Sequence, residues 1–252
     1  MDKSHASSDL AALRALIDDT DLGILTLVDR RFAAVAEVRA LKGKDGHASP
    51  VRPAREAEVI RRLALTKREH VSLETLVRLW RCLISAATAM QGPVRIHIGP
   101  DVDRHGEWRD LVGMHFAGLP IHVHADDKAV VAAVAEHPAD LAVVATDGRW
   151  TASFLTATNE KVAVIGRLPF LTRSGKPPLL ILGQAVSEAS GDDETLVVVE
   201  KGSAPPEGRR LWSTSGDDVH LVALDGYLDP GGKTKGGARI AGRYPRPLEL
   251  TP

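Results

Sequence analysis

Hydrophobic and polar positions follow one another in two different ways along this chain, and the change falls near residue 92. From Ser8 to Lys42, apolar side chains recur at close to the 3.6-residue period of an α-helix, and no proline interrupts them. The apolar positions are Leu13, Leu16, Ile17, Ile24, Leu25, Leu27, Val28, Val35 and Val38. At about 1.5 Å per residue this helix would span roughly 50 Å, which exceeds the width of a small domain. We therefore expect it to pack against another subunit or within a coiled bundle.

Two more helices are predicted before residue 92. The stretch 43–50 has the composition of a turn, and Pro53 suits the first turn of a helix that runs to about Lys67. Ser72 can cap a third helix, which continues to Gln91 and ends at Gly92-Pro93. Residues 1–92 are therefore predicted to form an all-α domain of three helices.

Beyond Pro93, short apolar runs that predict strands alternate with helical patterns. The predicted strands are 94–98, 121–124, 141–144, 162–165, 179–182, 196–199 and 219–224, and the predicted helices are 108–116 and 126–137. This alternation predicts a smaller α/β domain over residues 93–252 with a mainly parallel sheet. The tail is rich in glycine and proline, so we expect it to be poorly ordered in part.

Charge and cysteine content narrow the class of protein. The 252 residues carry a formal net charge of −1, which does not favour nucleic acid or an acidic membrane surface as a partner. Cys82 is the single cysteine, which fits a reducing cytoplasm, and its apolar helix predicts a place in the core. The sequence lacks the apolar runs of a signal peptide or a membrane span. We expect a soluble cytoplasmic protein.

Charged and amide residues interrupt the apolar faces of the three predicted helices. They are Arg14, Arg31, Lys42, Arg55, Glu56 and Gln91. Cations are rarely directed toward the interior of a small domain without an anion to neutralise them, so this set suggests a site for a small polycarboxylate. Any one of these residues taken alone is more often a solvated side chain, and Arg55-Glu56 alone is a common surface pair. The prediction therefore rests on the whole set.

The spacing along the first helix decides which cations can share one ligand. Arg31 and Lys42 are 11 residues apart and lie on one face, separated by roughly 16 Å along the axis. Arg14 precedes Arg31 by 17 residues, so it is rotated by about 100° and lies some 25 Å away. Arg14 is therefore either an ordinary surface residue or part of a site in another subunit of a two-fold pair.

The same residues resemble the all-helical class of chorismate mutases. The resemblance is carried by LRALIDDTDLGILTLVDRR, AEVRALK, PVRPAREAEVIRRL and LWRCLISAATAMQ, in order, and covers roughly residues 8–92. It implies an intertwined homodimer with two active sites, and an isomerase that rearranges chorismate to prephenate in phenylalanine and tyrosine biosynthesis. The reaction is an intramolecular pericyclic shift, so the resemblance implies no cofactor and no metal. The protein has to hold the reactive conformer and stabilise charge on the ether oxygen.

The resemblance also implies a role for each residue of the set. Arg14 would reach a substrate carboxylate in the partner's site, and Arg31 would hold a carboxylate in its own. Lys42 and Gln91 would hydrogen-bond the ether oxygen, Glu56 would accept from the ring hydroxyl, and Arg55 would support the site. The catalytic set is thus Lys42, Gln91, Arg31 and Arg14, and the substrate-binding set adds Arg52, Arg55, Glu56 and Ala87.

Two positions depart from the family's pattern. Arg52 stands where the family has an aspartate, and Ala87 stands where it has a serine. Glu56 is then left to contact the hydroxyl alone, while Thr88 is a partial substitute for the serine. These departures predict reduced efficiency rather than loss of activity.

Residues beyond 93 resemble the opening lobe of prephenate dehydratases in RIHIGPDVDRHGEW and in HADDKAVVAAVAEHPADLAVVATD. The family's Pro-Ile-Glu-Asn and Thr-Arg-Phe motifs are absent from the corresponding places near 145–148 and 177–180. We therefore expect a module without dehydratase activity that helps dimerise, binds a ligand or regulates. His122 and His124 share one face of a predicted strand, and His97 and His115 lie in other segments. Two alternating histidines can bind a metal, but ordinary half-buried histidines are the better interpretation.

Three functions follow from these patterns. The first is a monofunctional chorismate mutase with an accessory α/β module. The second is a bifunctional chorismate mutase–prephenate dehydratase, against which the missing motifs argue. The third is a non-catalytic protein that binds aromatic metabolites and regulates a partner, and Arg52 and Ala87 keep this alternative open.

Overall fold

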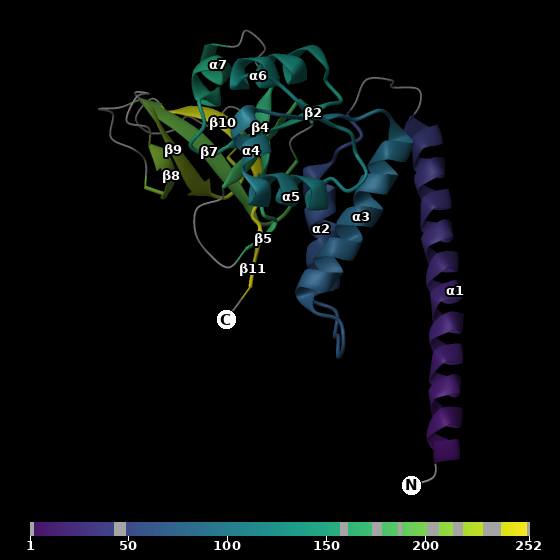
Figure 1. Cartoon of the computed structure of the whole chain (residues 1–252). Coiled ribbons are helices and arrows are strands. Elements are labelled where there is room, and N and C mark those ends of the chain that lie inside the picture. Colours follow the sequence, from purple (N-terminus) through teal and green to yellow (C-terminus); the bar gives the residue numbers. More distant parts are fainter. Residues whose placement is uncertain are drawn as a thin grey trace. The chain divides into compact units, whose positions relative to one another are not determined.

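The computed structural model describes residues 3–42, 49–156, 161–172, 178–185, 188–200, 207–213, 219–228 and 238–250. By its internal contacts the chain divides into two compact units, residues 1–46 and 47–252. The first unit is a single helix, α1 (Lys3–Lys42), and the second contains all other elements (Figure 1). The predicted order of a helical region followed by an α/β region is confirmed.

Helix α1 is continuous because its sequence has no proline, and its threonine hydroxyls are satisfied by carbonyls of the same helix. Thr20 donates to the carbonyl of Leu16 at 2.7 Å, and Thr26 donates to that of Leu22 at 2.9 Å. The apolar side chains of the helix remain accessible in the single chain. Leu13, Leu16, Ile17, Ile24, Leu25 and Leu27 are each more than half exposed.

The helices α2 (Pro53–Ala64) and α3 (Leu73–Gln91) match the predicted starts. Pro53 opens α2, and the hydroxyl of Ser72 caps α3 by accepting from the amide of Thr75 at 3.1 Å. Within the larger unit the two helices pack on each other and on Phe170, with a core of Ala57, Ile60, Leu76, Val77, Ile84 and Phe170. By contacts they therefore belong with the sheet rather than with α1. The functional boundary at residue 92 stays a prediction.

Arg61 explains why α2 is fixed to the sheet. Its guanidinium donates to the carbonyl and hydroxyl oxygens of Ser190 at 3.2 and 2.9 Å, to the carbonyl of Asp192 at 2.5 Å, and to that of Arg246 at 2.7 Å. Charge-assisted hydrogen bonds of this kind are individually strong, and here four of them join one helix to two loops.

The larger unit is built on a nine-stranded sheet in the order β2-β1-β3-β6-β4-β10-β7-β9-β8. In chain order, its strands are β1 (Ile96–Ile98), β2 (Ile121–Val123), β3 (Leu141–Ala145), β4 (Ala163–Leu168), β6 (Leu179–Gly183), β7 (Asp193–Glu200), β8 (Arg209–Ser213), β9 (Val219–Asp225) and β10 (Arg239–Pro245). A separate pair joins β5 (Leu171–Thr172) to β11 (Leu248–Glu249) in parallel.

The prediction of a mainly parallel sheet is wrong. Only β1–β2, β1–β3 and β4–β10 are parallel among the described strands of the large sheet. The other five neighbouring pairs are antiparallel. Helical crossovers exist only in the first half, where α4 (Pro100–Arg104) and α5 (Gly106–His115) join β1 to β2, and α6 (Asp127–Glu136) joins β2 to β3. After α7 (Trp150–Thr156) no helix links the described strands, and strands joined without crossovers pair antiparallel.

Both faces of the sheet are covered. On β3, Ala142 and Val144 pack with α6 and α7 in one core, whereas Leu141 and Val143 pack with α4 and α5 in another. Burial on both faces explains why this strand reads as an uninterrupted apolar run.

Three further predictions need correction. The α/β region is the larger part of the chain, because the nine-stranded sheet lies entirely within residues 93–252. The tail includes β10, which is buried inside the sheet, although residues 229–237 lie outside the described part. Cys82 is exposed, because Arg81 rather than Cys82 takes the inward-facing position of α3.

Candidate functional site

The predicted site residues fall on both units of the chain. Arg14 and Arg31 lie on α1, and Lys42 is its last residue, with a side chain outside the described part of the structure. The guanidinium carbon of Arg31 lies 5.7 Å from the centroid of the Phe32 ring. Arg14 is exposed. Along the helix axis Arg14 and Arg31 are about 25 Å apart, so one small ligand cannot contact both within one chain.

The other predicted residues lie on α2 and α3. Glu56, in the first turn of α2, forms an ion pair with Arg81 of α3, with Nη1 of Arg81 2.8 Å from Oε2 of Glu56. Gln91 donates to the carbonyl of Ala87 in its own helix at 3.3 Å, and Ala87 is buried. Because Arg81 lies ten residues before Gln91, the two positions are about 15 Å apart along α3. The structure therefore places Glu56 against the middle of α3 and Gln91 at its end.

The two arginines at the start of α2 each have a carboxylate partner. Nη2 of Arg52 lies 2.5 Å from Oε1 of Glu188, in a pair whose side chains are 35% and 40% exposed. Arg55 is paired with Glu58 at 3.0 Å and is more exposed still. Exposed pairs of this kind contribute little to stability. Arg52, which replaces an acidic residue of the family pattern, thus links α2 to the loop before β7.

Arg81 is the functional candidate that sequence reasoning missed. Its side chain is 7% exposed, and its guanidinium carbon lies 4.9 Å from the centroid of the Phe170 ring. The sequence contains a pattern that would have identified Arg81, because Val77, Arg81 and Ser85 are spaced four residues apart and form one buried stripe of α3. Within LWRCLIS, an arginine on the apolar stripe is the residue that needs a buried partner.

His115, at the end of α5, lies beside this arginine. Both residues line the same two cavities between α2, α3, α5 and the sheet. Burial and, to a smaller extent, the charge of Arg81 lower the pKa of His115 well below 6.5. At neutral pH His115 is therefore uncharged, and the pair of Arg81 and Glu56 is the charged centre of this region.

The other histidines form a second polar group at the sheet edge. Nδ1 of His97 lies 2.8 Å from Nε2 of His124, and Nε2 of His97 lies 3.1 Å from Oδ2 of Asp140. The His122 ring centroid lies 5.8 Å from that of His97. Burial lowers the pKa of His97, while the hydrogen bond with Asp140 opposes this shift. In the described part of the chain, no group of three potential ligands could hold a metal ion.

Among the described residues, no helix is both long and apolar enough to cross a bilayer. The long helix α1 fails on composition, since charged residues recur along its whole length.

Comparisons with known proteins bear on the N-terminal part of the chain. Residues 13–92 match the family described as chorismate mutase type II. A relative from Stutzerimonas stutzeri, named bifunctional chorismate mutase/prephenate dehydratase, is 33% identical over 97 residues. The matched stretch covers 36% of this chain and 27% of the relative's length.

Two solved structures resemble the larger part of the chain more distantly. Prephenate dehydratase from Streptococcus mutans is 13% identical and is covered over 97% of its length and 61% of this chain, with a TM-score of 0.38. A structure described as GqqA, a novel type of quorum quenching acylases, is 14% identical and is covered over 94% of its length and 60% of this chain, with a TM-score of 0.35.

The family match confirms the resemblance predicted from the residues themselves. It spans the positions of Arg14, Arg31, Lys42, Glu56 and Gln91. Residues 13–92 of this chain are therefore similar to the chorismate mutases of type II, in the segment where the sequence pattern predicts that similarity.

Proposed function

We propose that the chain is a chorismate mutase that converts chorismate to prephenate in the cytoplasm without a cofactor. The observation that carries the proposal is the family match over residues 13–92, which contains every member of the predicted cation and amide set. These residue types suit the chemistry, because the substrate is a dicarboxylate and charge develops on its ether oxygen in the transition state.

The active site in this proposal is assembled from two copies of the chain. Arg14 and Arg31 are too far apart on α1 to bind one substrate, and a two-fold partner brings Arg14 of one copy to the site of the other. The exposed apolar side chains of α1 support this assembly, because a helix with so many exposed leucines is stabilised when it packs on a second helix. Arg31, Lys42, Arg55, Glu56 and Gln91 complete the site in this proposal.

Glu56 needs a second hydrogen-bond partner in this mechanism. Its carboxylate is paired with Arg81 in the present structure, whereas its proposed role is to accept a hydrogen bond from the substrate's ring hydroxyl. The second oxygen of the carboxylate can take that role while the first stays on Arg81, since a carboxylate offers about four acceptor positions. Arg81 then holds the Glu56 carboxylate in place.

The direct test is incubation of the purified chain with chorismate, with prephenate and phenylpyruvate quantified by chromatography. We expect prephenate to form, and phenylpyruvate to stay at the non-enzymatic level, because the dehydratase motifs are absent. Phenylpyruvate above that level would instead support the bifunctional alternative that the relative's name suggests.

Variants of the ether-oxygen donors test the assignment of residues. Lys42→Ala and Gln91→Ala should each lower kcat/KM by at least about 100-fold, the usual loss when a preorganised donor to developing charge is removed. Lys67→Ala is the matched control, because this lysine is 86% exposed and pairs only with Glu69 among the described residues. Near-normal kcat/KM in either test variant would overturn the assignment.

The second candidate function is a non-catalytic protein that binds aromatic metabolites. The pairing of Glu56 with Arg81 and of Arg52 with Glu188 favours it, because both side chains are engaged within the protein. Chorismate that binds in calorimetry without turnover would support this alternative against the mutase.

A further inference from the structure

Arg81 presents one side of its guanidinium without a partner. Nη1 points to Glu56, whereas Nε is buried and has no hydrogen-bond partner. In the described part of the chain, the bond to Glu56 is the only hydrogen bond of this guanidinium. The side of the group formed by Nε and Nη2 therefore has no hydrogen-bond partner among the described residues, and two parallel N–H groups on that side match the two oxygens of a carboxylate.

An unused buried donor on a cation is costly, and Arg61 shows how a guanidinium of this chain is satisfied elsewhere. Arg61, on α2, uses its guanidinium for four hydrogen bonds to Ser190, Asp192 and Arg246. Leaving a buried polar group unsatisfied costs about 1–3 kcal/mol. The unbonded Nε of Arg81 carries this cost, and a bound anion would remove it.

The space next to Arg81 is mainly apolar. One cavity, of about 160 Å³, is lined by Val77, Leu111, Met114, Pro169, Phe170 and Leu171 together with Glu74, Arg78, Arg81 and His115. A smaller cavity on the sheet side shares Arg81, His115 and Phe170 and adds Glu56, Arg167 and apolar residues such as Phe116 and Ile181. Such walls bind a hydrocarbon body and leave a few polar groups to orient it.

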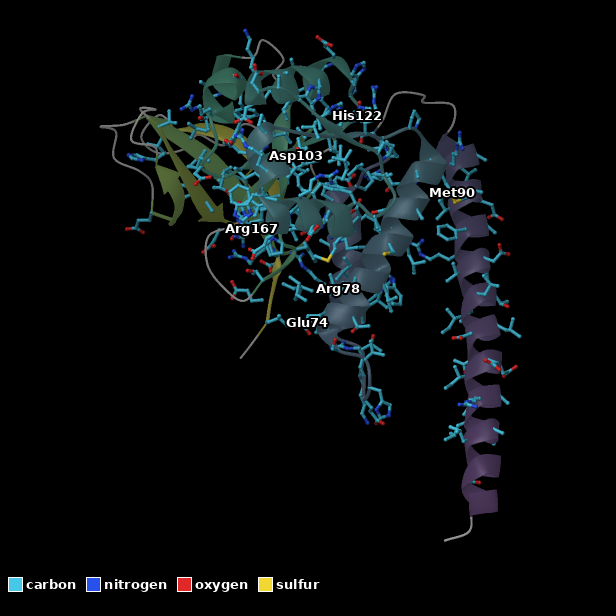
Figure 2. All side chains as sticks on the ribbon, viewed as in Figure 1. Glu74, Arg78, Met90, Asp103, His122 and Arg167 are labelled. Atoms are coloured by element: carbon cyan, nitrogen blue, oxygen red, sulfur yellow. The ribbon has the colours of Figure 1, made fainter. Side chains whose placement is uncertain are left out.

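Four charged groups surround the cavity, two of each sign. Arg78 and Arg81 line the larger cavity, Glu56 pairs with Arg81, and Glu74 lies one turn of α3 before Arg78 (Figure 2). The rest of the wall is apolar and offers no partner to further charge, so one carboxylate suits the cavity better than a phosphate. His115, which is neutral at neutral pH because burial lowers its pKa, adds no charge of its own.

We propose that the cavity at Arg81 is a ligand site that takes a small apolar monocarboxylic acid, whose carboxylate binds the Nε and Nη2 side of the guanidinium. The hydrocarbon part lies among Val77, Leu111, Met114 and Phe170. The site is separate from the ether-oxygen donors, since Arg81 is about 15 Å from Gln91 along α3.

Occupation of this site changes the surroundings of Glu56. A second carboxylate on Arg81 shares the positive charge that now binds Glu56, and so weakens that ion pair. This consequence for activity rests on the proposed function: in a mutase, the ligand would alter KM for chorismate through Glu56. Binding itself does not depend on turnover and is measured without chorismate.

The first experiment compares 3-phenylpropanoate with 3-phenylpropanamide by isothermal titration calorimetry on the purified full chain at pH 7.5. The two probes have the same hydrocarbon part and differ in charge. We expect the acid to bind at least about tenfold more tightly than the amide, because it forms a charge-assisted bidentate pair. Equal binding of the two probes, or no binding of the acid, would overturn the proposal.

The second experiment replaces the anchor. Arg81→Lys keeps the charge beside Glu56 but loses the paired donors, so the acid should bind about tenfold more weakly. Arg104→Lys is the matched control, because Arg104 is 73% exposed and pairs with Asp101 outside the cavity. Unchanged affinity in a folded Arg81→Lys protein, with folding checked by circular dichroism, would contradict the proposal.

A third variant keeps the test decisive if Arg81→Lys does not fold. Glu56→Gln removes the competing charge and leaves Arg81 intact, so the acid should bind more tightly than to the unmodified chain. Weaker or unchanged binding would count against Arg81 as the anchor. Binding is measured without chorismate, so a variant that loses mutase activity still gives a binding result. The proposed ligand site and the proposed mutase function can therefore be disproved independently of each other.

Discussion

Three buried or partly buried arginines of the larger unit are held in three different ways. Arg61 donates to backbone and hydroxyl oxygens of two loops, Arg81 has one carboxylate and an aromatic ring, and Arg167 is paired with Glu194 inside the sheet. Breaking a buried ion pair by removing one partner costs roughly 3–5 kcal/mol, because the other charge is left uncompensated. Of the three, only Arg81 adjoins both Glu56 of the predicted substrate set and a cavity of about 160 Å³. At the scale of single residues, it links the helices to the α/β module.

His115 makes the region around Arg81 sensitive to acid. Its pKa in the folded chain is well below 6.5 because of burial and the nearby guanidinium, whereas the unfolded chain titrates near 6.5. Unfolding therefore takes up a proton below pH 6.5, and the free energy of unfolding contributed by this group falls as the pH is lowered from 6.5. Above pH 6.5 His115 is neutral in both the folded and the unfolded chain, so its contribution to the free energy of unfolding no longer changes with pH.

The measurement is urea unfolding at several pH values between 5 and 7.5 for the unmodified chain and for His115→Gln. We expect the stability of the unmodified chain to fall more steeply with acid than that of the variant. His97→Gln is the comparison, because burial also lowers the pKa of His97 but Asp140 opposes the shift. Parallel curves for the unmodified chain and His115→Gln would show that His115 titrates normally in the folded state.

At the scale of elements, local signals predicted the helices well and the sheet poorly. Ser72 caps α3 as expected, and Asp126 caps α6 at the start of the helix predicted over 126–137, since residues that can accept from an amide three positions ahead are recognisable in the sequence. The direction of strand pairing depends on connections across the whole chain, so a local alternation of strands and helices misled the prediction for β6 and β7. The apolar positions of β10 were hidden by the surrounding glycines and prolines.

The candidate site was likewise predicted only in part. The spacing of Arg14, Arg31 and Lys42 follows from helix geometry, so residue order alone is enough to predict it. The pairing of Glu56 with Arg81 joins residues 25 positions apart on two helices, and that of Arg52 with Glu188 joins residues 136 apart. Contacts over such separations are set by tertiary packing, which residue order alone does not specify.

Gly242 is the position on which β10 depends most. A Cβ at this residue would lie 2.6 Å from the amide nitrogen of Val164 and closer still to its carbonyl oxygen, at a point where β10 pairs with both β4 and β7. Neither neighbour is a flexible side-chain end, so the backbone itself would have to move. Gly242→Ala should therefore destabilise the chain by about 3 kcal/mol, as expected for overpacking a closed core.

The check is the midpoint of denaturant unfolding, with Gly113→Ala as control. Gly113 lies inside α5, and nothing lies within 4 Å of an added Cβ, so alanine there should be neutral or stabilising by up to about 1 kcal/mol. A midpoint for Gly242→Ala equal to that of the unmodified chain would mean that β10 does not lie between β4 and β7 in solution.

At the scale of the whole molecule, the chain consists of a helix with exposed leucines and a compact unit that has its own cores. A helix of this kind gains most from a partner with the same apolar face, which is the general condition for a two-fold dimer. The separation of Arg14 from Arg31 along α1 leads to the same assembly, because each proposed site then needs one residue from the other copy.

Mixing two inactive variants tests whether sites are shared between copies. Arg14→Ala and Gln91→Ala homodimers should each have little activity, since every site lacks one residue. After unfolding and refolding a 1:1 mixture, half of the dimers contain one copy of each variant. In such a dimer, one site has lost both residues and the other has lost neither.

Half of the dimers are mixed, and each mixed dimer has one intact site out of two. The refolded mixture should therefore have about a quarter of the activity of the unmodified protein. Recovery of that size, measured as prephenate formed per total protein, would require Arg14 to act in the partner's site. If Arg14 acts in its own chain, each copy still lacks one essential residue, and the refolded mixture stays as inactive as its components. The same experiment therefore separates a shared site from one in which Arg14 acts within its own chain.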